Sequence, residues 1–124
     1  MEVSKHVFGH KDSRGEIFDI LQNVEISAVT LVSFVKNAVR GNHFHKKTTQ
    51  WNYVHSGEIE FIVKINDSIT RGVLQEGELL RIDPNEIHAM KATADSIIYV
   101  FTLGPRGGKE YESDTYRIEV GLLL

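Results

Sequence analysis

The chain has no cysteine among its 124 residues. This absence excludes disulfide bonds, thiolate metal sites and cysteine nucleophiles. Histidine nitrogens and carboxylate or amide oxygens are the side-chain atoms that remain to hold a metal, and they suit hard or borderline divalent ions. Any metal chemistry in this protein therefore depends on its six histidines and on its acidic and amide side chains.

The sequence also lacks an excess of positive charge. Lys and Arg number 14 and Asp and Glu number 17, which gives a formal net charge of −3 with histidine neutral. A protein with this balance has no overall field that attracts nucleic acid or an anionic membrane, so we expect neither as a partner. An anionic ligand must instead be held by local basic side chains.

Long apolar runs are missing as well. Residues 1–16 contain no apolar segment, and nowhere do the roughly 18 apolar residues of a membrane span follow one another. We therefore expect no signal peptide, no membrane segment and a cytoplasmic location.

Helical periodicity is not sustained anywhere, whereas apolar residues alternate with a period near two along most of the chain. Such alternation is typical of β-strands, and the alternating segments are rich in Val, Ile, Phe and Tyr. Short turn signals with Gly, Asn, Asp or Pro separate them. The expected strands span residues 15–21, 24–36, 42–47, 50–56, 58–66, 68–75, 77–83, 87–93 and 96–104.

Many short strands at this spacing predict an all-β protein, and the chain is long enough for one domain over residues 1–124 but not for two. A jelly-roll barrel is the economical arrangement, because it removes exposed sheet edges. Residues 105–124 change in composition and are expected to form a loop followed by a last strand or a dimer arm. The apolar end "VGLLL" would be poorly placed in water, so we expect a homodimer.

The segment "RGNHFHKKTTQW" carries the main candidate for a functional site. Side chains two apart in a strand share a face, so His43 and His45 can reach one point. Gln50 opens the next strand and can offer an amide oxygen there, while His88 begins a later strand that only the fold can bring close. These side chains are a metal-binding set, acid–base groups, or hydrogen-bonded strand histidines without a metal.

The same segment resembles the first motif of the cupin superfamily, which reads roughly G-x5-H-x-H-x3–4-E-x6-G. The residues that match it, with glutamine where most members carry glutamate, are His43, His45, Gln50 and Gly57.

A later segment resembles the second cupin motif, G-x5-P-x-G-x2-H-x3-N, with slightly altered spacing at Gly77, Pro84 and His88. The resemblance implies a double-stranded β-helix, which is a small jelly-roll barrel. It also implies a divalent metal ion, such as Zn, Mn, Ni or Fe, with the ligand set His43, His45, Gln50 and His88.

Three segments resemble cupins that act on carbohydrates. "DSRGEIFDI" resembles the D-x-R-G-x-(F/L) opening of nucleotide-sugar epimerases and ketoisomerases. "RGNHFH" resembles their R-G-x-H-x-H segment and the R-G-N-H-(Y/W)-H segment of capsular-polysaccharide enzymes. "EYESDTYRI" resembles the Y-x-E-S-D-Y-I-R ending of thymidine-diphosphate-sugar 3,4-ketoisomerases. The resemblance implies a sugar-like ligand.

In such enzymes a histidine removes the proton next to the sugar ketone, and arginines bind the diphosphate. Histidine suits the role of base because its ordinary pKa lies near neutrality. Carried onto this chain, the resemblance makes His43 or His45 the base. It makes Arg14 and Arg40 the anion contacts. The proton donors or orienting groups that it implies are Asn52, Tyr53 and Tyr99.

Metal binding and base catalysis compete here, since coordination occupies the lone pair that a base needs. The full set of three histidines favours the metal. We therefore predict a metal-binding cupin that binds or isomerises a carbohydrate or nucleotide sugar. The alternatives are a metal-independent sugar-nucleotide 3,4-ketoisomerase with a histidine base, and a non-catalytic cupin that binds a small ligand.

Overall fold

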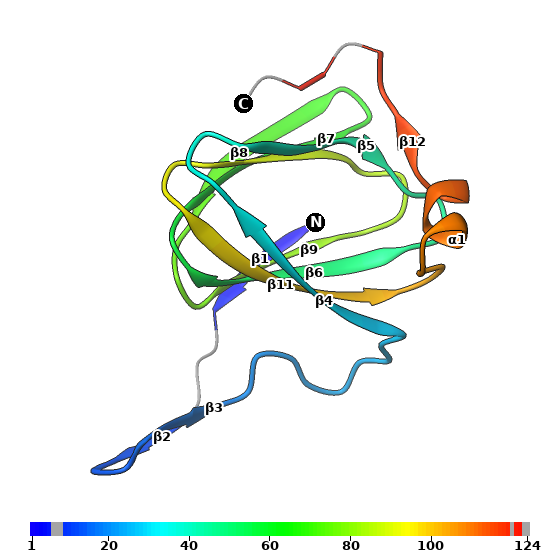
Figure 1. Ribbon diagram of the computed structural model, residues 1–124. Coiled ribbons are helices and arrows are strands. Elements are labelled where there is room, and N and C mark those ends of the chain that lie inside the picture. The colour runs from blue at the N-terminus through cyan, green and yellow to red at the C-terminus, as the bar shows by residue number, and fades with distance from the viewer. Residues whose placement is uncertain (6–8, 120, 123–124) are drawn as a thin grey trace.

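Two five-stranded antiparallel sheets form the body of the protein in a computed structural model, which describes residues 1–5, 9–119 and 121–122 (Figure 1). The first strands are β1 (Glu2–Lys5), β2 (Gly9–Asp12), β3 (Gly15–Phe18), β4 (Ala28–Phe34), β5 (Val39–Phe44) and β6 (Thr49–Ser56). They are followed by β7 (Ile59–Ile65), β8 (Ser68–Leu74), β9 (Glu78–Ile82), β10 (Ile87–Ala92) and β11 (Ser96–Leu103). A short helix, α1 (Lys109–Ser113), and a last strand, β12 (Tyr116–Arg117), complete the described elements.

The strands alternate between the two sheets. One sheet has the order β1-β9-β6-β11-β4, and the other has the order β12-β5-β10-β7-β8. From β4 to β7 and again from β8 to β11, each strand therefore lies in the sheet opposite its predecessor. This arrangement is the jelly-roll form of the double-stranded β-helix, so the predicted all-β fold class is confirmed.

Side-chain alternation decides what enters the space between the sheets. On β6, Val54 faces the interior, whereas Trp51 and Tyr53 pack with Leu79 in a second cluster on the outer face of their sheet. The interior cluster draws on strands of both sheets and includes Ile59 and other fully buried aliphatic side chains. Burial of each such side chain contributes about 1.5–3 kcal/mol, and together they hold the sheets face to face.

A strand overlaps each of the nine predicted segments, and most are one or a few residues shorter than expected. The strand predicted over residues 42–47 lies instead at Val39–Phe44, so His45 falls just after it. The strands β1 and β2 were not predicted, because "EVSK" and "GHKD" are mainly polar and show no apolar alternation. Tertiary pairing accounts for them: β1 pairs with β9, and β2 pairs with β3. Propensity in four-residue segments is too weak to signal such strands by itself.

The chain after β11 differs from the expected loop and long strand. The helix α1 precedes β12, and β12 has only two residues, which pair with Phe44 and His43 at the end of β5 (Figure 1). Five residues are too few for a helical period to be read from the sequence. Of the predicted apolar end, Val120, Leu123 and Leu124 lie outside the described residues.

The outer face of the β4-containing sheet is covered only in part. Phe18 and residues 20–21 pack near Trp51, while the β2–β3 hairpin extends away from the barrel (Figure 1). On the edge strand β4, Val29 and Leu31 are 61% and 60% exposed. Among the described residues, no helix is long and apolar enough to cross a membrane.

Candidate functional site

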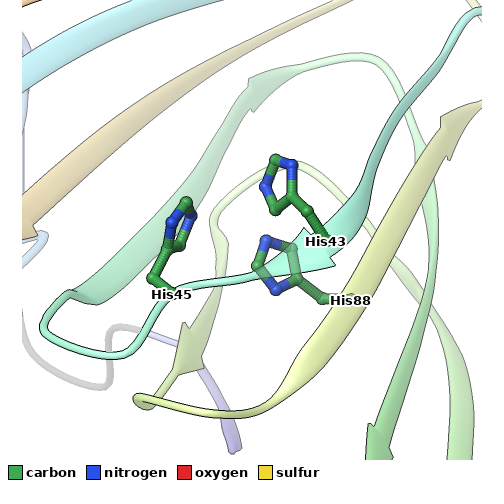
Figure 2. Close-up of side chains that lie close together, drawn as sticks. All are labelled: His43, His45 and His88. Atoms are coloured by element: carbon green, nitrogen blue, oxygen red, sulfur yellow. The ribbon is translucent and has the colours of Figure 1, made fainter. Parts of the chain in front are cut away.

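Three histidines from neighbouring segments converge (Figure 2). His43 on β5 lies directly opposite His88 on β10, and His45 follows one residue after β5 ends. The centroid of the His43 ring lies 4.8 Å from that of His45 and 4.7 Å from that of His88. One nitrogen from each ring lies within 4.8 Å of the other two, so the three can serve a common ligand.

Gly41 permits the close approach of β5 to β10 that brings His43 and His88 together. Its φ of 100° lies in the left-handed region that favours glycine. A Cβ there would lie 2.8 Å from the carbonyl oxygen of His88 and 3.0 Å from the Cα of Ala89. The register of the pairing shifts between these two residues. A larger residue at position 41 would separate the strands and with them the imidazoles.

Backbone carbonyls orient two of the rings. His45 donates through Nδ1 to the carbonyl oxygen of Asp114 at 2.9 Å, and His88 donates through Nδ1 to that of Glu86 at 3.0 Å. Because a carbonyl oxygen only accepts, Nδ1 carries the proton, and Nε2 of each neutral ring keeps its lone pair. The Nε2 of His45 is buried and has no hydrogen-bond partner in the described part of the chain. This leaves an acceptor available for a ligand.

Burial keeps two of the imidazoles neutral. It lowers the pKa of His88 to about 3 and the pKa of His43 to about 4, and the neighbouring imidazoles contribute in the same direction. Both rings are therefore uncharged near neutral pH. A neutral ring is the form in which histidine binds a cation or accepts a proton.

Asp114 ties the C-terminal segment to the turn after β5. Its carboxylate accepts hydrogen bonds from the backbone N–H of Lys46 at 3.0 Å, from that of Lys47 at 3.2 Å, and from Oγ1 of Thr48 at 2.8 Å. Burial alone would raise the pKa of Asp114, but these hydrogen bonds outweigh it and hold the pKa below its ordinary value. Asp114 therefore stays ionised and fixes the carbonyl group that orients His45.

A cavity of about 110 Å³ opens beside the histidines. Its apolar lining comes from Val32, Phe34, Met90, Ile98 and Val100. Its polar lining comes from Arg40, His43, Gln50, Asn52, His88, Arg106 and Tyr111, together with Gly41. No carboxylate belongs to this lining as far as the structure describes the chain. The cavity therefore combines an apolar wall with imidazole, amide and guanidinium groups.

Gln50 and Asn52 lie where the sequence placed them, on the same face of β6. Gln50 donates through Nε2 to Oδ1 of Asn52 at 3.4 Å, and Asn52 donates through Nδ2 to the carbonyl oxygen of Leu80 at 3.1 Å. Arg40 lies at the same cavity. The structure thus brings together six of the residues singled out in the sequence: His43, His45, Gln50, His88, Asn52 and Arg40.

Three other predicted residues do not line this cavity. Arg14 lies in the β2–β3 hairpin, where its NH2 group forms an ion pair with Asp12 at 2.7 Å and its side chain is 86% exposed. Tyr53 and Tyr99 belong to the cluster on the outer face of the sheet. The sheet separates them from the histidines, because neighbouring residues of a strand project from opposite faces.

Sequence reasoning missed Arg106 and Tyr111, as well as Asp114. The Arg106 guanidinium lies 4.5 Å above the centre of the Tyr111 ring, and its NH2 group donates to Oγ1 of Thr30 at 3.0 Å. The Tyr111 ring in turn lies 5.5 Å from the His45 ring. Tyr111 and Asp114 fall within "EYESDTYRI", so the only sequence signal for them was that resemblance. Arg106 follows Pro105 in a stretch that looked like a plain loop.

A protein-family model described as "Cupin domain" matches residues 30–104, which include the three histidines. A search of curated proteins gives no match. Among solved structures, a double mutant of a 3,4-ketoisomerase from Thermoanaerobacterium thermosaccharolyticum in complex with TDP is 25% identical in sequence. The match covers 94% of this chain and 86% of that chain, with a TM-score of 0.78.

Two further solved structures share the fold at lower identity. The TDP-quinovose 3,4-ketoisomerase from Campylobacter jejuni is 21% identical, and the match covers 94% of this chain and 92% of that chain with a TM-score of 0.81. The dTDP-4-dehydrorhamnose 3,5-epimerase from Sulfolobus tokodaii is 18% identical, covers 89% of this chain and 72% of that chain, and has a TM-score of 0.75. The similarity extends beyond the family match to most of the chain.

We expect the metal-free protein to lose stability as pH falls from 7.5 to 5, in part through His43. The unfolded chain binds a proton at histidine near pH 6.5, whereas the folded protein does so near pH 4 at His43. The unfolded state thus binds more protons between these values, and the free energy of unfolding decreases as pH falls. The slope per histidine is at most about 1.4 kcal/mol per pH unit. Urea denaturation should show a smaller pH dependence in His43→Asn, and equal slopes would contradict the assignment.

Asp114→Ala should lower the free energy of unfolding by about 1–3 kcal/mol, because the hydrogen-bonding groups of the turn at 46–48 lose their acceptor. A divalent ion offered to the three histidines should also bind roughly 10–100-fold more weakly than in the parent protein, because His45 loses this support. Asp95→Ala is the matched control, since Asp95 accepts a hydrogen bond from the backbone N–H of Lys36, and neither residue lines the cavity or belongs to the histidine cluster. Chelator competition measures the affinity. Equal metal affinity in the two variants would show that Asp114 does not act on the site.

Proposed function

The chain belongs to the cupin domain family, and from this membership we propose that it is a metal-binding cupin that binds a carbohydrate or nucleotide sugar and isomerises it. In this proposal His43, His45 and His88 hold a divalent ion of Zn, Mn, Ni or Fe. The observation that carries it is the convergence of three imidazole nitrogens within 4.8 Å of one another. Similarity to ketoisomerases and an epimerase of sugar nucleotides supports the substrate class.

The donor set fits a borderline divalent ion. Imidazole nitrogen is a preferred ligand of these metals. Two of the rings are oriented by backbone carbonyls, as histidine ligands usually are, and the Nε2 of His45 is a buried acceptor that lacks a protein partner among the described residues. Gln50 is the proposed fourth ligand, and its neutral oxygen makes the site less negative than one with the usual glutamate.

A bound ion of this kind supplies a Lewis acid that polarises a carbonyl or hydroxyl group of the ligand. The chain itself supplies the remaining functions. The Asn52 amide, held by the carbonyl group of Leu80, offers hydrogen bonds to a sugar hydroxyl. The apolar wall around Phe34 and Met90 excludes water and packs on carbon-bound hydrogens. Arg40 binds an anionic group of the ligand.

A metal-independent ketoisomerase is the second candidate, and the 25% identical ketoisomerase supports it. His43 would be its base, because it lines the cavity and its ring has no hydrogen bond to any described residue. Its pKa of about 4 weakens that role, since a base works best with a pKa near the working pH. We therefore place the metal-binding cupin first.

Metal analysis tests the first candidate. The protein purified without chelator should contain close to one equivalent of Zn, Mn, Ni or Fe, and chelation should lower its melting temperature, because an ion that binds only the folded state stabilises it. His45→Asn and His88→Asn should lose the metal. His55→Asn, which changes an exposed histidine on β6, should keep it. Elemental analysis without metal, together with an unchanged melting temperature on adding each ion, would contradict the proposal.

Isotope exchange tests the reaction. With TDP-4-keto-6-deoxyglucose in D2O, the protein should place deuterium next to the ketone, and His43→Asn should reduce the rate by at least about 100-fold. Loss of exchange after chelation supports the metal enzyme, whereas exchange that survives chelation supports the second candidate. Exchange is followed by NMR of the sugar. If no exchange occurs while the ligand binds, the protein is a binding module and not an isomerase.

We also propose that the protein is a homodimer. Exposed apolar side chains support association: Val29 and Leu31 on the edge strand β4, Val35 just after it, and Ile17 on the extended hairpin. Leu31→Glu should shift the protein toward the monomer by placing a charge in the contact, with Ser33→Glu as the milder comparison on the same strand. Light scattering after size exclusion measures the mass. A monomeric parent protein at micromolar concentration would refute the dimer.

A further inference from the structure

Two arginines at the cavity have no acidic partner among the described residues. The Arg106 guanidinium lies on the Tyr111 ring and donates to the Thr30 hydroxyl. Arg40 donates through NH2 to the carbonyl oxygen of Ser33 at 3.1 Å, and its guanidinium lies 5.2 Å from the centre of the Phe34 ring. Both guanidinium groups therefore contact neutral groups only.

Three arginines outside the cavity are neutralised. Arg14, Arg81 and Arg117 each form an ion pair with a carboxylate, and Arg117 does so within the C-terminal segment next to the site, with Glu112. Arg40 and Arg106 differ from these three, since neither has such a pair among the described residues. Each guanidinium has five N–H donors, and each forms one hydrogen bond within the described residues. Donors and charge remain for a ligand that carries both acceptors and negative charge.

The size of the cavity limits what that ligand is. Sites for drug-sized ligands usually measure about 300–1,000 Å³, and an engineered cavity of about 150 Å³ holds benzene. At about 110 Å³, this cavity holds part of one sugar ring or a smaller acid. A nucleotide does not fit inside, so its diphosphate would lie outside the cavity walls. Within the cavity, a small anionic group attached to the sugar carbons can contact Arg106 while the sugar lies at the histidines.

We propose that the ligand of this cavity is a sugar acid whose carboxylate is bound by Arg106 with help from Arg40. A planar carboxylate matches the guanidinium fork with two parallel hydrogen bonds. Tyr111 and Thr30 position Arg106 for this contact. The inference rests on the proposed function for the carbohydrate nature of the ligand, and it adds the acidic group and the residue that recognises it.

Matched ligands test this inference on the full chain as purified. Glucuronate and glucose differ in the carboxylate, and calorimetry should find glucuronate bound at least about 10-fold more tightly. Arg106→Gln should weaken glucuronate binding by roughly 10–100-fold, and Arg106→Lys by less, because lysine keeps the charge but loses the fork. Arg81→Gln, which removes an arginine that is already paired outside the cavity, should leave binding unchanged. Circular dichroism and melting curves confirm that each variant is folded, and Arg40→Gln provides a second test at the cavity.

Several results would overturn the inference. One is equal affinity for glucuronate and glucose. Another is an unchanged affinity for glucuronate in both Arg106→Gln and Arg40→Gln when these variants are folded. A third is Arg106-dependent binding of TDP-glucose without binding of glucuronate, which would identify the anion as a diphosphate. Metal content is measured on the same samples. A metal-free parent protein that still binds glucuronate through Arg106 would refute the metal-binding function and leave the carboxylate assignment intact. A parent protein that contains the metal but shows no preference for glucuronate over glucose would refute the carboxylate assignment and leave the metal-binding function intact.

Discussion

The antiparallel pairing of β5 with β10 is the constraint on which the site depends. It places His43 directly opposite His88, and the left-handed backbone of Gly41 lets the two strands approach closely at that point. Because β12 pairs with the other edge of β5, the same strand also brings the C-terminal segment to the site. That segment carries Asp114, whose carbonyl group orients His45. One strand thus links all three imidazoles.

Hydrogen bonds to the backbone hold the polar groups of the site in place. Inside the barrel, Nδ1 of His45 and His88 and the amide group of Asn52 each donate to a backbone carbonyl oxygen. Groups satisfied in this way stabilise the fold at little cost. Among the described residues, the buried Nε2 of His45 lacks a partner, as do Oδ1 of Asn42 and Oγ1 of Thr102 away from the cavity lining, while Arg40 and Arg106 turn free donors toward the cavity. The free acceptor of His45 and the free arginine donors are the physical basis for proposing both a cation and an acidic ligand.

The two faces of β6 serve different purposes. Gln50 and Asn52 line the cavity, while Trp51 and Tyr53 pack on the outer face, where the N-terminal segment covers part of the sheet. Residues next to each other in sequence therefore belong to different surfaces, one for a ligand and one for packing or association. The placement of Tyr53 and Tyr99 away from the histidines follows from this alternation.

The sequence by itself determined the fold class and the positions of most main strands, because these features follow from local alternation of side chains. It also predicted that His43 and His45 converge, although His45 lies just after β5. It also predicted that Gln50 and Asn52 would face the same side as the histidines. Only the tertiary structure decided that His88 lies opposite His43, since their pairing joins segments 45 residues apart and depends on sheet order. The same holds for Arg106, Tyr111 and Asp114, which a short helix and a two-residue strand bring to the site. Contacts between distant segments leave no period in the sequence, so local reasoning could not find them.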